Sequence, residues 1–221
     1  MTSPPAILYN TCYQIFNRGI TGENIFIQER NFSHFLNLYA KYIEPIADTY
    51  AYCLLRNHFH LLVRIKSEAE ISKKFYSDQI YTKPGNITSP LPNQTTKPIR
   101  PYNPSRQFSN FFNAYAKAIN AKFGRTGSLF QHPFRRIQIN SDIYFYRVMI
   151  YIHQNPQKHG FVEDFREWKY SSYGFLVGEK PTKMKKLSTL DWFGNASQYA
   201  RMHDEKVDET INFPYIGEDN D

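Results

Sequence analysis

The order of the hydrophobic patterns along the chain constrains its fold more than any other feature. Segments rich in β-branched and aromatic residues predict strands, and segments with apolar residues at helical spacing predict helices. The expected strands cover 7–17, 49–56, 58–66 and 133–139, and the expected helices cover 31–46, 105–124 and 141–155. Ser105 and Ser141 are the expected helix N-caps, and Gly124 and Asn155-Pro156 the expected helix ends.

From residue 7 to residue 139 the order is strand, helix, strand, strand, helix, strand. This order is typical of the ferredoxin-like (RRM-like) fold, in which an antiparallel sheet carries helices on its faces. The short connection Arg56-Asn57 predicts an antiparallel hairpin between two of the strands. We therefore predict an α+β fold with an additional C-terminal helical segment.

Two segments differ in composition from the rest of the chain. Six of the thirteen prolines fall within 67–104, which predicts a mobile insertion with little secondary structure. From Arg201 to Asp221 there are seven acidic residues against two basic ones, which is typical of a solvated tail. We expect one main domain over 1–178, including the insertion, and an acidic tail over 179–221.

The strand at 58–66 carries two histidines separated by one residue. Successive side chains of a strand point to opposite faces, so His58 and His60 share one face and Phe59 lies on the other. Two imidazoles at this spacing can ligate one divalent cation. The alternative is a pair of hydrogen-bonded or partly exposed histidines, and the spacing alone does not exclude it.

The positive charge of the chain is unevenly distributed. The formal net charge is +7, and residues 105–160 contain eight Lys or Arg but only one acidic residue, Asp142. Such an excess is typical of a surface that binds a polyanion, with an ordinary solvated face as the alternative. The aromatic content of 17% suits base stacking as well as core packing.

The remaining features concern the compartment. Cys12 and Cys53 match no zinc spacing and predict no disulfide framework, which favours a reducing environment. The N-terminal residues lack a secretion signal, and no apolar run is long enough to cross a bilayer. We expect a cytoplasmic protein without a membrane partner, associated with the nucleoid when it is bound to DNA.

A series of short motifs resembles the HUH-type single-tyrosine transposases, and in particular the REP-associated tyrosine transposases. The motifs occur in order between about residues 7 and 175: Arg-Asn-His-Phe-His-Leu-Leu-Val at 56–63, Phe-Asn-Ala-Tyr at 112–115, Gly-Arg-Thr-Gly-Ser-Leu-Phe at 124–130, Tyr-Ile-His-Gln-Asn-Pro at 151–156 and Trp-Lys-Tyr-Ser-Ser-Tyr at 168–173. Their joint occurrence is far more specific than any one of them.

The resemblance implies a site and a reaction. His58 and His60 would ligate Mg²⁺ or Mn²⁺, and Tyr115 would be the nucleophile because it precedes the Arg-Thr-Gly turn. Tyr115 would attack a phosphodiester of single-stranded DNA and form a 5′-phosphotyrosine. The implied DNA contacts are Arg18, Arg56, Lys117, Arg125, Arg135 and Arg136. Spacing alone, however, favours a core position for Tyr115, since it shares an apolar stripe with Phe111 and Ile119.

The sequence departs from the resemblance at one position. Insertion-sequence relatives place a glutamine four residues after the tyrosine as a third metal ligand, and here that residue is Ile119. Asn120 is the nearest amide and is the candidate third ligand, although it lies about 140° around the helix from Tyr115.

The resemblance predicts a transposase-like nicking and joining enzyme that acts near DNA hairpins. The missing glutamine leaves open a second function, a domesticated protein that binds hairpin or single-stranded DNA without cutting it. An RNA-binding module and a two-histidine phosphoesterase fit the motifs less well. The DNA sequence recognised and the choice between monomer and homodimer stay open.

Overall fold

The computed structural model describes residues 6–81, 102–179 and 181–205. A four-stranded sheet forms its centre, with the strand order β2-β3-β1-β4 and antiparallel pairing throughout. The strands are β1 (Cys12–Arg18), β2 (Ala47–Leu54), β3 (His58–Ile65) and β4 (Arg135–Ile139). The ferredoxin-like prediction is therefore confirmed, including the tight hairpin between β2 and β3.

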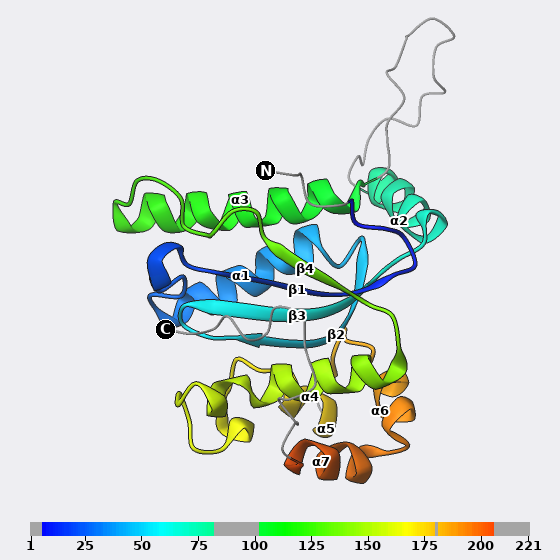
Figure 1. Cartoon of the computed structure of the whole chain (residues 1–221). Helices are drawn as coiled ribbons and strands as arrows, with labels where there is room; N and C mark the ends of the chain where they lie inside the picture. Colours follow the sequence, from blue (N-terminus) through cyan, green and yellow to red (C-terminus); the bar gives the residue numbers. More distant parts are fainter. Residues whose placement is uncertain (1–5, 82–101, 180, 206–221) are drawn as a thin grey trace, which may run out of the picture.

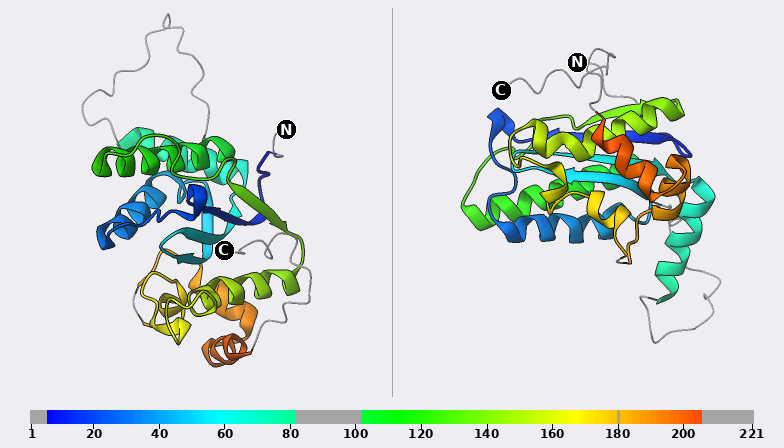
Figure 2. Two further views of the ribbon diagram at one scale, coloured as in Figure 1. Left: turned by 60° about the vertical axis from the view of Figure 1, so that its left-hand side comes forward. Right: turned by 90° about the horizontal axis from the view of Figure 1, so that it is seen from below.

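Helices cover both faces of this sheet and form a three-layer molecule (Figure 1). On one side lie α1 (Glu29–Tyr42) and α3 (Pro104–Phe123), and on the other lies α4 (Asp142–Lys158). Beyond α4 are the short helices α5 (Tyr173–Val177), α6 (Lys186–Phe193) and α7 (Ala196–Asp204). The left view of Figure 2 shows the same layering. We call the two sides of the sheet the α1–α3 face and the α4 face.

The alternation of side chains along β3 divides the core between these faces. Phe59, Leu61 and Val63 belong to the apolar cluster under α1 and α3. Leu62 belongs to the separate cluster formed with α4 and the helices beyond it. Since successive strand residues point to opposite sides, His58 and His60 share the α4 face with Leu62. A strand covered on both faces explains the continuous apolar character of this segment.

Helix boundaries follow the expected capping residues in most places. Ser141 caps α4 by accepting a hydrogen bond from the Tyr144 backbone, and Gly124 ends α3 in the left-handed conformation at φ 63°. The expected N-cap Ser105 is wrong by two residues, because Asn103 caps α3 and Pro104 occupies its first turn. The expected stop at Asn155-Pro156 is also wrong, because α4 continues through Pro156 to Lys158.

Part of the expected insertion is helical. The helix α2 (Glu68–Tyr81) follows β3 directly. It begins with a reciprocal cap, in which the Ser67 hydroxyl accepts from the Glu70 backbone N–H and the Glu70 carboxylate accepts from the Ser67 backbone N–H. The prediction of little secondary structure is therefore wrong for 68–81, and residues 82–101 lie outside the described part of the chain.

The expected solvated tail is folded as far as Asp204. Phe193 of α6 and Tyr199 of α7 are buried in the cluster with α4. His153 of α4 is fully buried and lies 2.8 Å from both the His203 ring of α7 and the Ser172 hydroxyl. These contacts join α7 to α4, and the division of the chain at residue 178 stays a prediction. Residues 206–221, with most of the acidic side chains, lie outside the described residues.

None of the described helices combines the length and the apolar character needed to cross a lipid bilayer.

Candidate functional site

The histidine pair lies at the start of β3, between the sheet and α4. Both side chains are buried, with 6% of His58 and 3% of His60 exposed, and their ring centroids are 5.3 Å apart. His60 stacks on Phe16 of β1, which is its register partner in the sheet. The pairing of β1 with β3 therefore fixes the position of the His60 ring.

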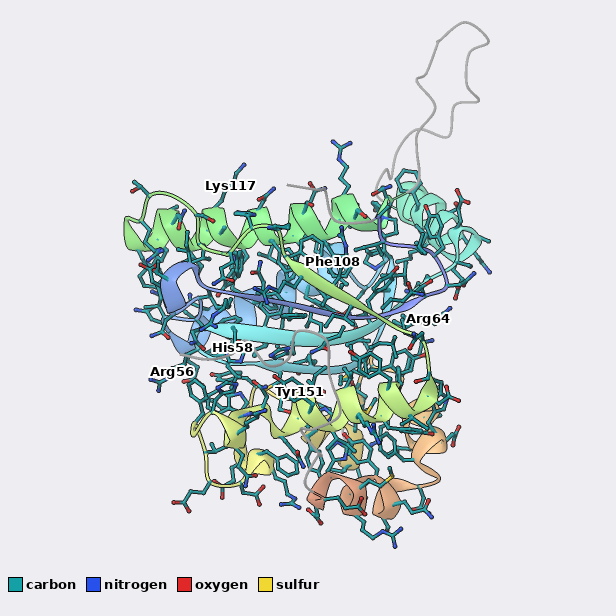
Figure 3. All side chains as sticks on the ribbon, viewed as in Figure 1. Arg56, His58, Arg64, Phe108, Lys117 and Tyr151 are labelled. Carbon is teal, nitrogen blue, oxygen red and sulfur yellow. The ribbon has the colours of Figure 1, made fainter. Side chains whose placement is uncertain are left out.

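The helix α4 presents a tyrosine and an amide to this pair. The Tyr151 ring packs edge-on against the His60 ring at a centroid distance of 5.5 Å. One helical turn later, the Asn155 Oδ1 lies 2.9 Å from the His58 Nε2. Residues four apart in a helix share one face, which explains how both side chains reach the same pair. Figure 3 shows Tyr151 and His58 on the two sides of the space between α4 and β3.

The predicted nucleophile Tyr115 lies in a different part of the molecule. It belongs to α3, its side chain is 0% exposed, and its hydroxyl donates a 2.8 Å hydrogen bond to the Ile25 carbonyl. Its ring packs among aromatic side chains of the α1–α3 face, including Phe35. Burial raises the pKa of Tyr115 far above its usual range. The predicted proximity of Tyr115 to the histidines is wrong, because the sheet lies between them.

The candidate third ligand Asn120 also lies away from the histidines. Its side-chain amide donates a 2.9 Å hydrogen bond to the Gly127 carbonyl and so ties α3 to the turn that follows it. Asn120 is on the same helix as Tyr115, on the α1–α3 side of the sheet. It does not lie beside the histidine pair.

The predicted DNA contacts divide into two groups. Arg18 and Arg135 line a cavity of about 90 Å³ together with both histidines and Phe16, Asn17 and Gln131. Arg56 is exposed in the turn two residues before His58, and Figure 3 shows it at the same end of the sheet. Arg18 and Arg135 place positive charge beside the histidine pair, and Arg56 lies at the same end of the sheet.

The other three predicted contacts lie elsewhere. Lys117 is exposed on α3 and points away from the sheet in Figure 3. Arg136 occupies the β4 position next to Arg135, so its side chain leaves the opposite face, over the Phe134 ring. Arg125 forms an ion pair with Glu23. The structure does not bring these residues to the histidines.

The donor atoms around His58 fit a divalent cation. The His58 Nδ1 lies 2.8 Å from the Asn57 Oδ1 and its Nε2 lies 2.9 Å from the Asn155 Oδ1, so each ring nitrogen faces an amide oxygen. A neutral ring with its proton on Nδ1 leaves the Nε2 lone pair and the Asn155 oxygen as two acceptors for a cation. Two ligand atoms at right angles around an ion with ~2.1 Å bonds lie ~3 Å apart, close to this separation. No group of three or more His, Cys, Asp or Glu side chains that could hold a metal occurs among the described residues.

Sequence reasoning missed Tyr151 and Asn155 although both lie in a quoted motif. The resemblance places an amide four residues after the tyrosine, and Tyr151 and Asn155 have this spacing. The Asn155-Pro156 pair predicts a helix end, and this interpretation gives Asn155 no functional role although the expected helix 141–155 contains both residues. In the structure the helix continues, and the 151–155 pair fits the implied pattern better than Tyr115 and Ile119 do.

Comparison with known proteins agrees with this fold and with the motifs. No protein-family model matches the chain. A Haemophilus influenzae protein assigned to the REP-associated tyrosine transposases is 28% identical over 148 residues, which are 67% of this chain and 68% of the relative. A solved REP-associated tyrosine transposase bound to a REP hairpin superimposes with a TM-score of 0.53 at 14% identity, over 82% of this chain and 88% of the other.

Proposed function

We propose that this chain, a distant homologue of the REP-associated tyrosine transposases, nicks and rejoins single-stranded DNA beside a hairpin with Tyr151 as its nucleophile. One observation carries the proposal. Tyr151 and Asn155 extend from one face of α4 onto the His58–His60 pair, in the place that the resemblance gave to Tyr115. Transfer of a phosphodiester to a phenol uses a tyrosine as nucleophile and imidazoles that hold a metal ion. Both kinds of group lie together here, beside arginines.

The reaction exchanges one phosphorus–oxygen bond for another. The phenolic oxygen of Tyr151 attacks phosphorus and loses its proton, while the bond from phosphorus to the 3′-oxygen breaks. The departing 3′-oxygen takes up a proton and becomes a free hydroxyl, and the DNA on the 3′ side of the cut stays on the enzyme through its 5′-phosphate, as a 5′-phosphotyrosine. Rejoining reverses these steps on another 3′-hydroxyl, so the number of phosphoester bonds is unchanged and no external energy source is required.

The surrounding side chains have separate roles. His58, His60 and Asn155 would hold Mg²⁺ or Mn²⁺, which when bound neutralises charge on the phosphate oxygens. Arg18 and Arg135 line the adjacent cavity and would orient the phosphodiester. The Lys158 ammonium lies 5.3 Å from the Tyr151 ring centroid, where its charge favours the negative charge that develops on the phenolic oxygen.

The proposed substrate is a DNA hairpin with single-stranded flanks. The solved structural relative is bound to a REP hairpin. In this chain, the exposed Arg56 and the cavity arginines gather at the end of the sheet where the histidines begin β3. A flanking strand that enters there would place a phosphate against the histidine pair while the stem stays outside.

The test compares two tyrosines in the same chain. Hairpin oligonucleotides labelled at the 5′ or the 3′ end are incubated with the protein and Mg²⁺ or Mn²⁺, and products are separated on denaturing gels. The wild type is expected to form a covalent adduct with the DNA on the 3′ side of the cut, and Tyr151→Phe to form none. Tyr115→Phe is the matched control and is expected to keep the adduct.

Each other outcome has a defined meaning. An adduct that persists in Tyr151→Phe would contradict the assigned nucleophile. Loss of the adduct in a folded Tyr115→Phe protein with retention in Tyr151→Phe would restore the assignment implied by the sequence. Hairpin binding without any adduct under either ion would select the non-catalytic DNA-binding function.

A further inference from the structure

The buried amide of Gln14 is a polar group whose place in the core is not explained by packing. Gln14 lies on β1 between Leu62 of β3 and Ile137 of β4. An apolar side chain would be expected at the Gln14 position. Its side chain is 0% exposed. Burial of an amide costs roughly 1–3 kcal/mol unless its donors and acceptors find partners.

Within the described part of the chain, the Gln14 side chain makes one hydrogen bond, and it is to His60. The Gln14 Nε2 lies 3.3 Å from the His60 Nδ1, and the Gln14 Oε1 has no hydrogen-bond partner among the described residues. The buried amide has two N–H donors and one oxygen acceptor but makes one hydrogen bond. Burial of Gln14 therefore lowers the stability of the fold. Its position beside a proposed metal ligand suggests what the amide does there.

The two ring nitrogens of His60 cannot both be available to a cation. When the Gln14 NH₂ group donates to Nδ1, the neutral ring carries its proton on Nε2, which then has no lone pair to offer. When the amide turns so that Oε1 accepts from Nδ1–H, the proton moves to Nδ1 and Nε2 becomes a ligand. At His58 an amide oxygen, the Asn57 Oδ1, lies 2.8 Å from Nδ1, which is the geometry of the second arrangement.

We propose that Gln14 is a positioning residue that sets which nitrogen of His60 carries the proton and thereby whether His60 can bind a divalent cation. This inference rests on the proposed function, because it takes His60 as a ligand. Phe16 and Tyr151 hold the plane of the His60 ring, so the amide controls the proton and leaves the ring in place.

Two substitutions of Gln14 change the proton position of His60 to different degrees. In Gln14→Glu the carboxylate can only accept, so the proton is fixed on Nδ1 and Mn²⁺ affinity is expected to rise about tenfold or more, with the added negative charge contributing. In Gln14→Leu the amide no longer favours a proton on Nε2, so the affinity is expected to lie between those of the wild type and Gln14→Glu. Leucine is an apolar residue of similar size in a position lined by Leu62 and Ile137, so this variant is expected to fold.

The experiment measures the proton position and the affinity separately, in the full-length protein without DNA. Long-range ¹H–¹⁵N spectra of the metal-free protein report which His60 nitrogen is protonated, and the EPR signal of free Mn²⁺ reports binding. We expect protonation of Nε2 in the wild type and of Nδ1 in Gln14→Glu. Gln138→Leu is the matched control, because it makes the same substitution on β4 at a position exposed on the other face, opposite Tyr13.

Failure of this inference differs from failure of the proposed function. If Mn²⁺ binding is lost in His60→Ala but the Gln14 variants bind like the wild type, the metal site stands and the role of Gln14 is overturned. If the wild type binds no Mn²⁺, the metal-dependent function fails, and the spectra still decide whether Gln14 sets the proton position. The same protonated nitrogen in the wild type and Gln14→Glu would overturn the inference in either case.

Discussion

At the scale of single residues, the neighbourhood of a side chain decides its chemistry more than its type does. Tyr115 and Tyr151 are both tyrosines on apolar helical stripes. The hydroxyl of Tyr115 is held by the Ile25 carbonyl in the interior of the α1–α3 face, whereas the Tyr151 ring lies against His60. Of these two tyrosines, only Tyr151 lies beside the histidine pair.

The predicted DNA-contacting arginines also differ in their surroundings, because only some of them line the cavity at the histidines. This difference predicts how DNA binding depends on salt. Removal of Arg18 and Arg135 together is expected to weaken binding to a hairpin with single-stranded flanks, because both line the cavity at the histidines. For single strands each lost phosphate contact reduces the slope of log affinity against log salt by roughly 0.7, so the double alanine variant should lose roughly 1.4. Fluorescence anisotropy at several salt concentrations measures this slope.

The matched control for the arginine prediction is the double variant Lys117→Ala and Arg136→Ala. It removes the same amount of charge from the α1–α3 side of the sheet. Its salt slope is expected to equal that of the wild type. An equal loss in both double variants would mean that the DNA follows overall charge and not the histidine site.

At the scale of elements, α4 is the helix on which the proposed site depends. Its outer side is joined to α7 by the buried His153–His203 contact, and its inner side carries Tyr151 and Asn155. The sequence predicted its start at Ser141 but not its passage through Pro156. The sequence also contains the Ser67–Glu70 capping pair, which marks the start of α2. The high proline content of 67–104 led to the prediction of little secondary structure there.

The contact between α4 and α7 predicts a loss of stability in acid. Burial, together with the nearby Arg166 charge, lowers the pKa of His203 to about 4 from 6.5, and burial also lowers the pKa of His153 well below its usual value. Between the lowered and the ordinary pKa values, these two histidines are therefore protonated in the unfolded chain and neutral in the folded protein. His203 contributes stability above pH 6.5 that is lost as the pH falls toward 4, up to about 3 kcal/mol at 1.36 kcal/mol per pKa unit.

Urea unfolding at a series of pH values measures this effect. In His203→Phe the ring still packs among Phe193 and Tyr199 but cannot titrate, so the decline between pH 6.5 and 4 should become shallower. The exposed His132 provides the control, because His132→Gln should keep the wild-type profile. A parallel decline in the wild type and His203→Phe would place the acid sensitivity elsewhere.

At the scale of the whole molecule, the helices after residue 178 complete the layer that covers the α4 face. Phe193 and Tyr199 are 5% and 0% exposed in that layer. The two core clusters pack on opposite faces of the sheet. Because α6 and α7 pack against α4, they also stabilise the position of α4 over the histidine pair. The composition of the C-terminal region gave no indication of this role.

Truncation tests the contribution of this layer. A chain that ends at Gly178 would expose the surface that Phe193 and Tyr199 cover and lose roughly 3–6 kcal/mol, at 1.5–3 kcal/mol for each large apolar side chain. A chain that ends at Glu205 retains every described helix and is the control, expected to unfold at the wild-type urea concentration. Equal midpoints for both truncations would show that 1–178 is an independent domain.

The sequence by itself determined the order of strands and helices, the hairpin that presents His58 and His60, and the family resemblance. These features are local, because they follow from side-chain alternation, helical spacing and turn residues within short segments. Only the tertiary structure decided which helix covers which face of the sheet. A helix can pack on either face without any change in its own pattern, so the choice of Tyr151 over Tyr115 depends on contacts between residues far apart in the chain.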